Sequence, residues 1–263
     1  MNIILYPPNN PIALSILNLD IRWYGVIMAL SMFIGILLCA HIFKKNLPQD
    51  DYNTFIDIIP VVIIFAILGA RFFYVIGDWE FYSKHLEEII FINHGGLSIY
   101  GALLAGISTI FYYSRKKKFN MLKYCDCIAL VMPLCQAIGR WGNFINQEAY
   151  GAPCNGLFKM FIDEHHRLPE FSNISYYHPA FLYESILNIF AFCILFFIFK
   201  KYKNIKAGTI FALYLLLYSI IRIIVENVRI DSILNVSGVP VAIIISLFIA
   251  LFSTILLFRI HKQ

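Results

Sequence analysis

The sequence contains little charge. Only 14% of its 263 residues are Asp, Glu, Lys or Arg, whereas a soluble domain typically carries about 25%. Hydrophobic residues make up 60% of the chain, and its mean hydropathy is +0.72. These values exclude an ordinary soluble domain and indicate a membrane protein.

The sequence also lacks the spacings that bind metals or mark several other classes of protein. Cys125 and Cys127 form a C-x-C pair, which is not a zinc spacing, and His165 and His166 are adjacent in a polar segment. No set of Asp residues has the metal-binding spacing of a CDP-alcohol phosphotransferase. There is no internal repeat of the kind found in many secondary transporters. We therefore expect neither a metal site nor another cofactor.

Long apolar stretches recur through the whole chain. About 20 apolar residues can cross a hydrocarbon core of about 30 Å, and backbone polar groups inside a bilayer must be paired within the segment, which favours helices. The first residues lack the basic region of a cleavable signal. We predict an all-α polytopic membrane protein with about seven transmembrane helices. The predicted spans are Leu17–Ala40, Thr54–Ile76, Leu97–Tyr113, Cys125–Arg140, Pro179–Phe199, Ala207–Val225 and Val239–Phe258.

Basic residues accumulate in alternate connections between these spans. The positive-inside rule then places the N-terminus outside and the C-terminus in the cytoplasm. On this topology the chain, residues 1–263, is a single membrane-embedded domain with a small extracytoplasmic head at about residues 143–178. The net charge of +5 is an orientation signal, and we expect no nucleic-acid partner. The basic residues on the predicted cytoplasmic side are Lys44, Lys45, Arg115, Lys116, Lys117, Lys118, Lys123, Lys200, Lys201, Lys203, Lys206, Arg259 and Lys262.

A polar, glycine-punctuated stretch follows the fourth predicted span, where the chain from Gly139 to Gly151 reads GRWGNFINQEAYG. Polar and charged groups at an apolar boundary are costly unless they are paired or functional. We interpret the stretch as a site, although an ordinary polar helix end is the simpler alternative. Its hydrogen-bonding side chains are Arg140, Asn143, Asn146, Gln147 and Glu148.

Arginine is the basic residue within the spans and at their outer ends. Its planar guanidinium group suits phosphate or carboxylate and stays charged in poorly hydrated places. Arg222, Glu226 and Arg229 are spaced i, i+4 and i+7, which places them on one face of a helix. We interpret them as a phosphate-reading ridge, the alternative being arginines that snorkel to lipid headgroups. The arginines within the predicted spans or at their outer ends are Arg22, Arg71, Arg140, Arg222 and Arg229.

Two further motifs lie near the predicted outer surface. Residues 94–106 read HGGLSIYGALLAG, in which Gly101 and Gly106 allow close helix packing. Tyr100 points into a bundle interior if this stretch is more than a packing motif. Tyr24, in the sequence IRWYG, is either a site residue or an aromatic-belt anchor.

These motifs, together with HPAFLYE and IRIIVENVR, occur in an order that resembles the bacterial prolipoprotein diacylglyceryl transferase family. The likeness covers nearly the whole chain, and GRWGNFINQEAYG is highly specific to that family. It implies a seven-helix enzyme of the bacterial cytoplasmic membrane without a metal cofactor. Such enzymes transfer the diacylglyceryl group of phosphatidylglycerol to the lipobox Cys thiol in the signal peptide of a prolipoprotein. The products are a thioether-linked lipid and glycerol phosphate.

The resemblance extends to single positions. The signature residues of the family match the stretch that starts at Gly139, and its Arg-Glu-Arg matches IRIIVENVR. The family usually has His, a proposed general base, where this chain has Tyr100. The matching positions are Tyr24, Asp126, Arg140, Asn143, Glu148, Gly151, Arg222, Glu226 and Arg229.

The implied reaction has two requirements, which suggest roles for these residues. The departing phosphate needs preorganised positive charge, for which we expect Arg140 and Arg222, with Glu226 fixing their geometry. The thiol must lose its proton because the thiolate is the nucleophile. The base is left open between Glu148, a relay through Tyr100, and His94. The expected catalytic residues are Arg140, Arg222, Tyr100 and Glu226, and the expected phosphatidylglycerol-binding residues are Arg140, Tyr24, Asn143, Glu148, Gly151 and Arg229.

Two other functions remain compatible with these features. A transporter or channel would also place charges inside the membrane, with a repeat or with helices interrupted at mid-depth. A non-catalytic phospholipid-binding protein would keep the arginines but would have no use for the Asn-Glu motif.

Overall fold

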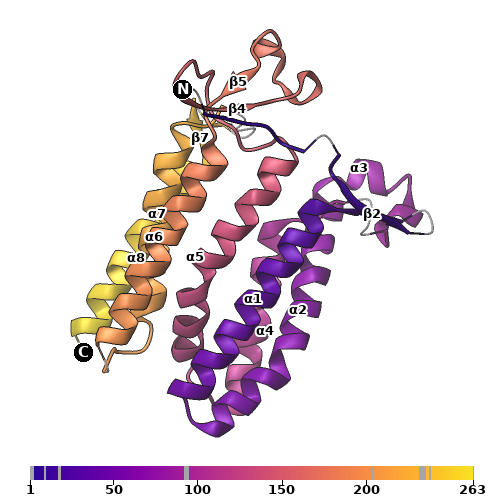
Figure 1. Ribbon diagram of the computed structural model, residues 1–263. Coiled ribbons are helices and arrows are strands. Elements are labelled where there is room, and N and C mark those ends of the chain that lie inside the picture. The colour runs from indigo at the N-terminus through magenta and orange to yellow at the C-terminus, as the bar shows by residue number, and fades with distance from the viewer. Residues whose placement is uncertain are drawn as a thin grey trace. The chain divides into compact units, whose positions relative to one another are not determined.

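A computed structural model describes residues 3–8, 10–16, 19–91, 95–202, 204–230, 235–236 and 238–262. Helices dominate the chain (Figure 1). It divides into two compact units, a first unit of Met1–Cys39 with Cys125–Gln263 and a second unit of Ala40–Tyr124. The helices are α1 (Trp23–Asn46), α2 (Gln49–Gly77), α3 (Trp79–Tyr82), α4 (Ile99–Lys117), α5 (Met121–Ile145), α6 (Ala180–Lys201), α7 (Thr209–Glu226) and α8 (Val241–Lys262), with short 3-10 turns η1 (Leu86–Ile89), η3 (Glu164–His166) and η4 (Pro169–Phe171). The strands are β1 (Ile3–Leu5), β2 (Ile12–Ile16), β3 (Leu19–Arg22), β4 (Phe158–Phe161), β5 (Tyr176–Tyr177), β6 (Asn235–Val236) and β7 (Val239–Pro240).

Within the described residues, six helices are long and apolar enough to cross a membrane, namely α1, α2, α5, α6, α7 and α8. The protein is therefore an all-α polytopic membrane protein. Helix α4 covers the remaining predicted span, but its last turn carries Arg115, Lys116 and Lys117. The count of seven spans stays a prediction.

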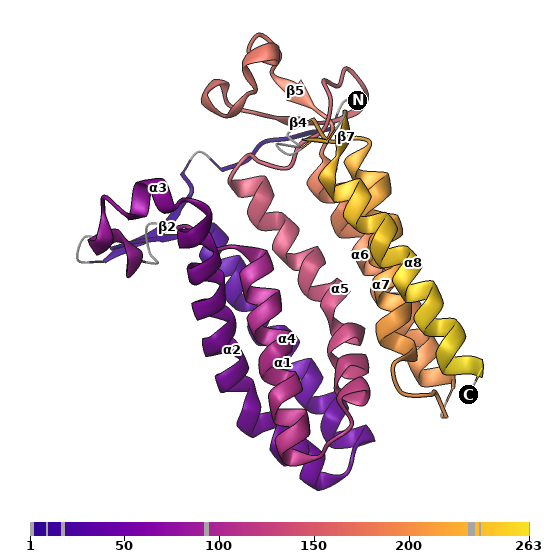
Figure 2. The same cartoon turned by 180° about the vertical axis from the view of Figure 1, so that it is seen from behind.

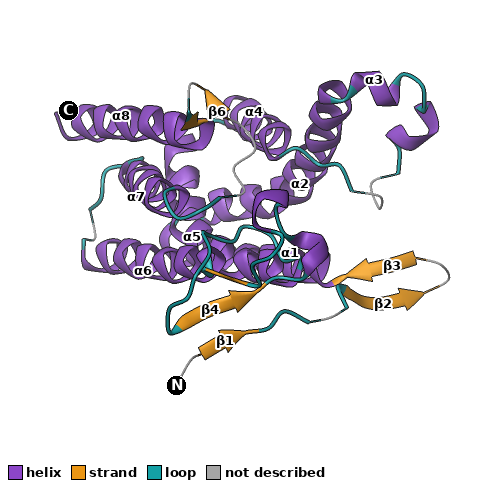
Figure 3. Cartoon of the chain, turned by 90° about the horizontal axis from the view of Figure 1, so that it is seen from above, coloured by secondary structure: helices purple, strands orange, loops and turns teal. Residues whose placement is uncertain are grey.

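The first predicted span, Leu17–Ala40, began too early. Helix α1 starts at Trp23, and the preceding strand β3 pairs antiparallel with β2 in a hairpin (Figure 3). An apolar run does not by itself distinguish a strand from a helix, and the beginning of this run belongs to the β2–β3 hairpin.

The fourth predicted span ended too early, because α5 continues to Ile145. The first residues of GRWGNFINQEAYG are therefore helical.

In the first unit, hydrogen bonds between side chains and backbone join the helices. The Ser31 hydroxyl on α1 donates to the Cys135 carbonyl on α5 at 2.8 Å, and the Ser185 hydroxyl on α6 donates to the Ala137 carbonyl at 2.9 Å. Helix α7 packs between α6 and α8 (Figure 1). These bonds place α5 and α6 side by side near Arg140.

Asp126 on α5 has a structural role at the start of α7. Its carboxylate accepts hydrogen bonds from the Gly208 amide at 2.6 Å and the Phe211 amide at 2.8 Å. A carboxylate there satisfies amides that the first turn of a helix leaves unpaired. At about 1.5 Å per residue, Phe211 and Arg222 are about 16 Å apart along α7. Asp126 thus fixes the beginning of α7, away from the arginine near its end.

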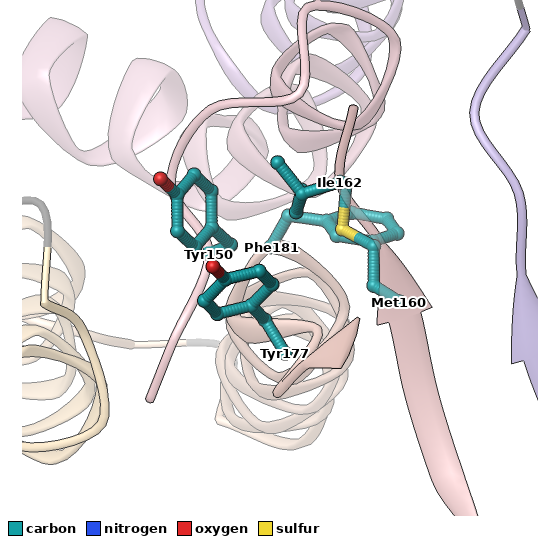
Figure 4. Close-up of a cluster of buried hydrophobic side chains, with 5 residues drawn as sticks. All are labelled: Tyr150, Met160, Ile162, Tyr177 and Phe181. Atoms are coloured by element: carbon teal, nitrogen blue, oxygen red, sulfur yellow. The ribbon is translucent and has the colours of Figure 1, made fainter. Parts of the chain in front are cut away.

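The segment between α5 and α6 is the one for which the sequence predicted a head. It contains β4 and β5, which pair antiparallel. Strand β1 lies parallel to β4 (Figure 3) and completes a three-stranded sheet. Next to these strands lies a buried cluster that includes Phe181 of α6 (Figure 4). Burying aromatic side chains stabilises strongly, so this cluster fastens the head to the helices. Its members are Tyr150, Met160, Ile162, Tyr177 and Phe181.

In the second unit α2 packs against α4 (Figure 2). The buried Arg71 of α2 donates from its guanidinium group to backbone carbonyls of the connection between these helices, including Ile89 at 2.9 Å, Gly95 at 2.8 Å and Gly96 at 2.9 Å. Its donors are engaged with backbone. Arg71 therefore organises the connection between these helices.

A close crossing of α2 and α4 gives a first prediction, because a Cβ added at Gly101 would overlap the carbonyl oxygen of Gly69. Gly101→Ala should push the helices apart and lower the free energy of unfolding by about 1–3 kcal/mol. Gly106→Ala on the same helix is the matched control, because its Cβ would meet Ala66 at an ordinary 3.8 Å. Thermal unfolding of both variants in detergent measures the difference. Equal melting temperatures would contradict the close crossing.

Candidate active site

Three helices of the first unit contribute charged side chains to one cluster. Arg140 on α5 contacts Glu184 on α6, with 2.7 Å between Nη2 and Oε1. Arg222 on α7 approaches the other oxygen of the same carboxylate, with 3.9 Å between Nη1 and Oε2. The Glu184 side chain is 2% exposed, whereas Arg140 is 25% and Arg222 is 17% exposed. A buried carboxylate thus pairs closely with Arg140 and lies near Arg222, and both guanidinium groups are partly accessible.

The end of α7 adds a second carboxylate. Glu226 lies one turn after Arg222 and pairs with it at 2.7 Å between Oε2 and Nη2. The sequence predicted that Glu226 fixes the geometry of Arg140 and Arg222; the structure pairs it with Arg222, and the role stays a prediction. The predicted helical face is wrong for Arg229, because α7 ends at Glu226. Arg229 instead forms an antiparallel backbone bridge with Gly151, which brings two of the expected substrate-binding residues together.

A chain of hydrogen bonds leads from Arg140 to Glu148. Arg140 donates from Nη1 to the Asn143 side-chain oxygen at 3.1 Å, and the Asn143 amide nitrogen donates to Glu148 Oε1 at 2.8 Å. Asn146 also approaches Glu148 Oε1, at 3.4 Å. Arg140 and Asn143 lie one turn apart on α5, because this helix extends to Ile145. The signature stretch therefore forms one polar network rather than a simple helix end.

Glycines bring the remaining parts of this network close together. A Cβ at Gly142 would lie 2.7 Å from the Tyr24 ring, so Tyr24 of α1 packs directly on α5. Gly151 donates from its amide to the His178 carbonyl at 2.8 Å, and the amide of Ala152 donates to the Val228 carbonyl at 3.0 Å. These bonds tie the end of the signature to the segment before α6 and to the segment after α7.

Two of the candidate bases, Tyr100 and His94, have no contact in this network among the described residues. Tyr100 lies on α4 in the second unit and is 59% exposed. His94 lies outside the described residues. The role expected of Tyr100 stays a prediction.

The charges of the cluster balance. Arg140 and Arg222 contribute two positive charges, and Glu184 and Glu226 contribute two negative charges. Removing one partner of a buried ion pair typically costs about 3–5 kcal/mol, because the other charge is left uncompensated.

In the part of the chain that the structure describes, no group of three or more His, Cys, Asp or Glu residues could hold a metal ion.

Sequence reasoning missed Glu184. The motif HPAFLYE ends at this residue, which stands in an otherwise apolar stretch at the start of α6. A carboxylate in such a position is a signal for pairing or function. Its partners, however, come from α5 and α7, and pairing between helices cannot be read from spacing along one helix.

Comparison with known proteins shows what the chain is similar to. The family model described as prolipoprotein diacylglyceryl transferase matches residues 11–259. Similar curated proteins are named phosphatidylglycerol–prolipoprotein diacylglyceryl transferase. One from Finegoldia magna is 39% identical over 253 residues, covering 96% of this chain and 96% of the relative. One from Thermosynechococcus vestitus is 37% identical over 245 residues (93% and 90%), and one from Clostridium botulinum is 38% identical over 254 residues (97% and 98%).

The packing at Gly151 gives a second prediction. A Cβ there would lie 2.8 Å from both His178 Cβ and Val228 Cγ1. Gly151→Ala should therefore break the bridge to Arg229 and reduce activity at least about tenfold, equivalent to about 1.4 kcal/mol, while circular dichroism shows the helices intact. Gly156→Ala in the same loop is the control, because its Cβ would meet Cys154 Sγ at 3.4 Å. Full activity of Gly151→Ala would show that the close approach is unimportant.

Proposed function

Because this chain belongs to the prolipoprotein diacylglyceryl transferase family, we propose that Arg140 and Arg222 hold the phosphate of phosphatidylglycerol during diacylglyceryl transfer. The chain is a membrane enzyme, and its substrates are phosphatidylglycerol and a prolipoprotein. One observation carries the assignment of the phosphate site. Glu184 brings two guanidinium groups from different helices to one carboxylate and leaves both partly accessible.

The reaction is a substitution at a saturated carbon. The lipobox cysteine loses its proton to a base, and its sulfur forms a bond to the terminal glycerol carbon of the diacylglyceryl group. The bond between that carbon and the phosphate oxygen breaks, and glycerol phosphate leaves with the bonding electrons. Negative charge accumulates on the departing phosphate, where preorganised guanidinium groups in a poorly hydrated site stabilise it.

The other residues of the network support this step. Asn143 and Glu148 orient Arg140 and face the headgroup, and Glu148 is one candidate for the thiol base. Tyr24 packs on α5 beside them. Arg229 adds positive charge, and Gly151 allows its backbone bridge. The role expected of Tyr100, a proton relay or orienting group, stays a prediction.

The same proposal places the enzyme in the bacterial cytoplasmic membrane, with the N-terminus outside, the C-terminus in the cytoplasm and the active site toward the outer leaflet. The distribution of basic residues supports this orientation. The names of the relatives favour a transferase over a transporter or a non-catalytic lipid-binding protein. The direct test incubates the purified protein with phosphatidylglycerol and a lipobox peptide and looks for the thioether product by mass.

Substituting Arg140 tests the phosphate assignment. Arg140→Lys keeps the charge but loses the planar fork, and we expect transfer to fall about a hundredfold or more. Arg115→Lys, in the last turn of α4, is the control and should retain full activity. Melting temperatures of both variants show whether folding is intact. Wild-type rates for a folded Arg140→Lys enzyme would refute the phosphate clamp.

Glu184 acts as a positioning residue, which a separation of kcat from KM can test. In Glu184→Gln the site loses one negative charge, so attraction to the lipid phosphate increases and KM for phosphatidylglycerol should stay equal or fall. The two guanidinium groups lose their shared anchor, and kcat should fall at least about tenfold. A variant with a raised KM and an unchanged kcat would contradict this role.

A further inference from the structure

The small sheet formed by β1, β4 and β5 has one buried face and one partly exposed face. Side chains alternate between the two faces along a strand. Met160 of β4 and Tyr177 of β5 belong to the buried cluster (Figure 4). Their neighbours Phe161 and Tyr176 therefore lie on the opposite face, and both are only partly buried. The proposed reaction makes no use of this second face.

Three aromatic rings lie side by side on the exposed face. The centroid of the Phe161 ring is 5.5 Å from that of Tyr6 and 6.1 Å from that of Tyr176. These are the distances of packed aromatic pairs. Tyr6 follows β1 directly and is 60% exposed. The rings thus form an apolar surface that crosses all three strands of the sheet.

Two cations lie against these rings. Lys159 Nζ is 4.5 Å from the centroid of the Tyr176 ring, and the Arg167 guanidinium carbon is 6.0 Å from that of Phe161. Arg167 is held in place, because its guanidinium group donates to two backbone carbonyls at 2.9 Å and 2.8 Å. The described strands β1, β4 and β5 contain no acidic residue. We call this surface the head platform; it consists of Tyr6, Lys159, Phe161, Arg167 and Tyr176.

The head platform points away from the membrane. The buried face of the same sheet packs against Phe181 in the first turn of α6 and against Phe144 near the end of α5. Both helices are long and apolar enough to cross a membrane. The opposite face of the sheet is therefore turned away from these helix ends, and its partner is a molecule in the aqueous phase.

The composition of the head platform fits an extended acidic polypeptide. Aromatic rings offer rigid contact area to a peptide backbone and its apolar side chains, and tyrosine hydroxyls bond to peptide groups. The two cations attract carboxylates and repel a basic segment. Large exposed aromatic surfaces of this kind commonly mark interaction sites.

We propose that the head platform binds the polypeptide that follows the lipobox cysteine of the prolipoprotein, and that it favours acidic residues there. The inference rests on the proposed function, because it requires the head to lie outside and the thiol to react at the Arg140 cluster. The apolar part of a signal peptide precedes its processing site. The polypeptide after the cysteine thus emerges on the side of the head.

The head platform lies within reach of the proposed site. Gly151 ends the signature stretch, and the amide of Cys154 donates to the Tyr176 carbonyl at 2.9 Å. An extended chain advances at most about 3.5 Å per residue, so the backbone of Tyr176 lies within about 15 Å of Gly151. A substrate covers the same distance with about four or five extended residues. We therefore expect the platform to contact side chains from about the fifth residue after the cysteine.

Two acceptor peptides that differ only in charge test this proposal. Both carry the same apolar segment and lipobox, and about six residues from the fifth after the cysteine are Asp and Glu in one peptide and Asn and Gln in the other. The wild-type enzyme should use the acidic peptide with a kcat/KM about threefold higher, mainly through a lower KM, because accessible ion pairs change affinity by such factors. The difference should shrink at high salt. Equal values at low salt would overturn the proposal.

Substituting Lys159 identifies the platform as the origin of this preference. In Lys159→Gln the ratio of the two kcat/KM values should fall to about one, whereas Lys159→Arg keeps the charge and should keep the ratio. Lys84→Gln is the matched control, because Lys84 is an exposed lysine of the α2–α4 connection and its removal should not change the ratio. If Lys159→Gln slows both peptides by the same factor, Lys159 is structural and the proposal fails.

Two further measurements complete the test. If Lys159→Gln does not fold, Tyr6→Ala removes an exposed ring instead. It should reduce the advantage of the acidic peptide over one that ends directly after the cysteine, and an unchanged advantage would overturn the proposal. If Lys159→Gln keeps the ratio but binds less to phosphatidylglycerol vesicles, the platform is a membrane contact and the proposal fails.

The proposed function is tested separately by Arg140→Lys. This variant should slow transfer to both peptides by the same factor and keep their ratio, because Arg140 acts on the donor lipid. Wild-type rates in Arg140→Lys would refute the phosphate clamp, and the ratio of the two peptides in the wild-type enzyme would still decide for or against the head platform.

Discussion

One physical constraint governs the structure: a charged side chain inside an apolar helix bundle has to be paired. Glu184, whose side chain is 2% exposed, pairs with Arg140 at 2.7 Å and lies 3.9 Å from Arg222, which has Glu226 as its closer partner at 2.7 Å. Arg140, Glu184 and Arg222 come from α5, α6 and α7. The interaction that makes buried charge tolerable therefore also fixes the relative positions of these three helices at the proposed phosphate site.

The partners of each charged group distinguish structural charges from functional ones. Arg71 directs its guanidinium group to backbone carbonyls, and Asp126 accepts from backbone amides at the start of α7. Both are buried, and their hydrogen bonds complete local structure. Arg140 and Arg222 are paired with carboxylates instead and remain partly exposed. Groups of this second kind can exchange or share partners when an anionic ligand arrives, whereas groups of the first kind cannot do so without unfolding a turn.

The sequence was sufficient to predict the long apolar helices. Inside a bilayer the backbone N–H and C=O groups of such a run cannot bond to water, and a helix pairs them within the segment. It was insufficient where an apolar run could also form a strand, as in the β2–β3 hairpin before Trp23. Spacing along one helix correctly joined Arg222 to Glu226. It failed at Arg229, because α7 ends before that residue. It also could not identify Glu184, whose partners lie on two other helices, or the small sheet of the head, whose strands are far apart in the sequence.

The balance of charge gives Gly151 a place in the proposed chemistry. The cluster of Arg140, Arg222, Glu184 and Glu226 is formally neutral. A phosphate monoester carries more negative charge than the diester from which it is formed, so departure of glycerol phosphate requires positive charge beyond this cluster. The proposal gives Arg229 a supporting positive charge, and the backbone of Arg229 is bridged to Gly151, where a Cβ would come within 2.8 Å of Val228 Cγ1. The absence of a side chain at Gly151 is thus the steric condition under which the backbone of Arg229 is held beside the signature stretch just after α7.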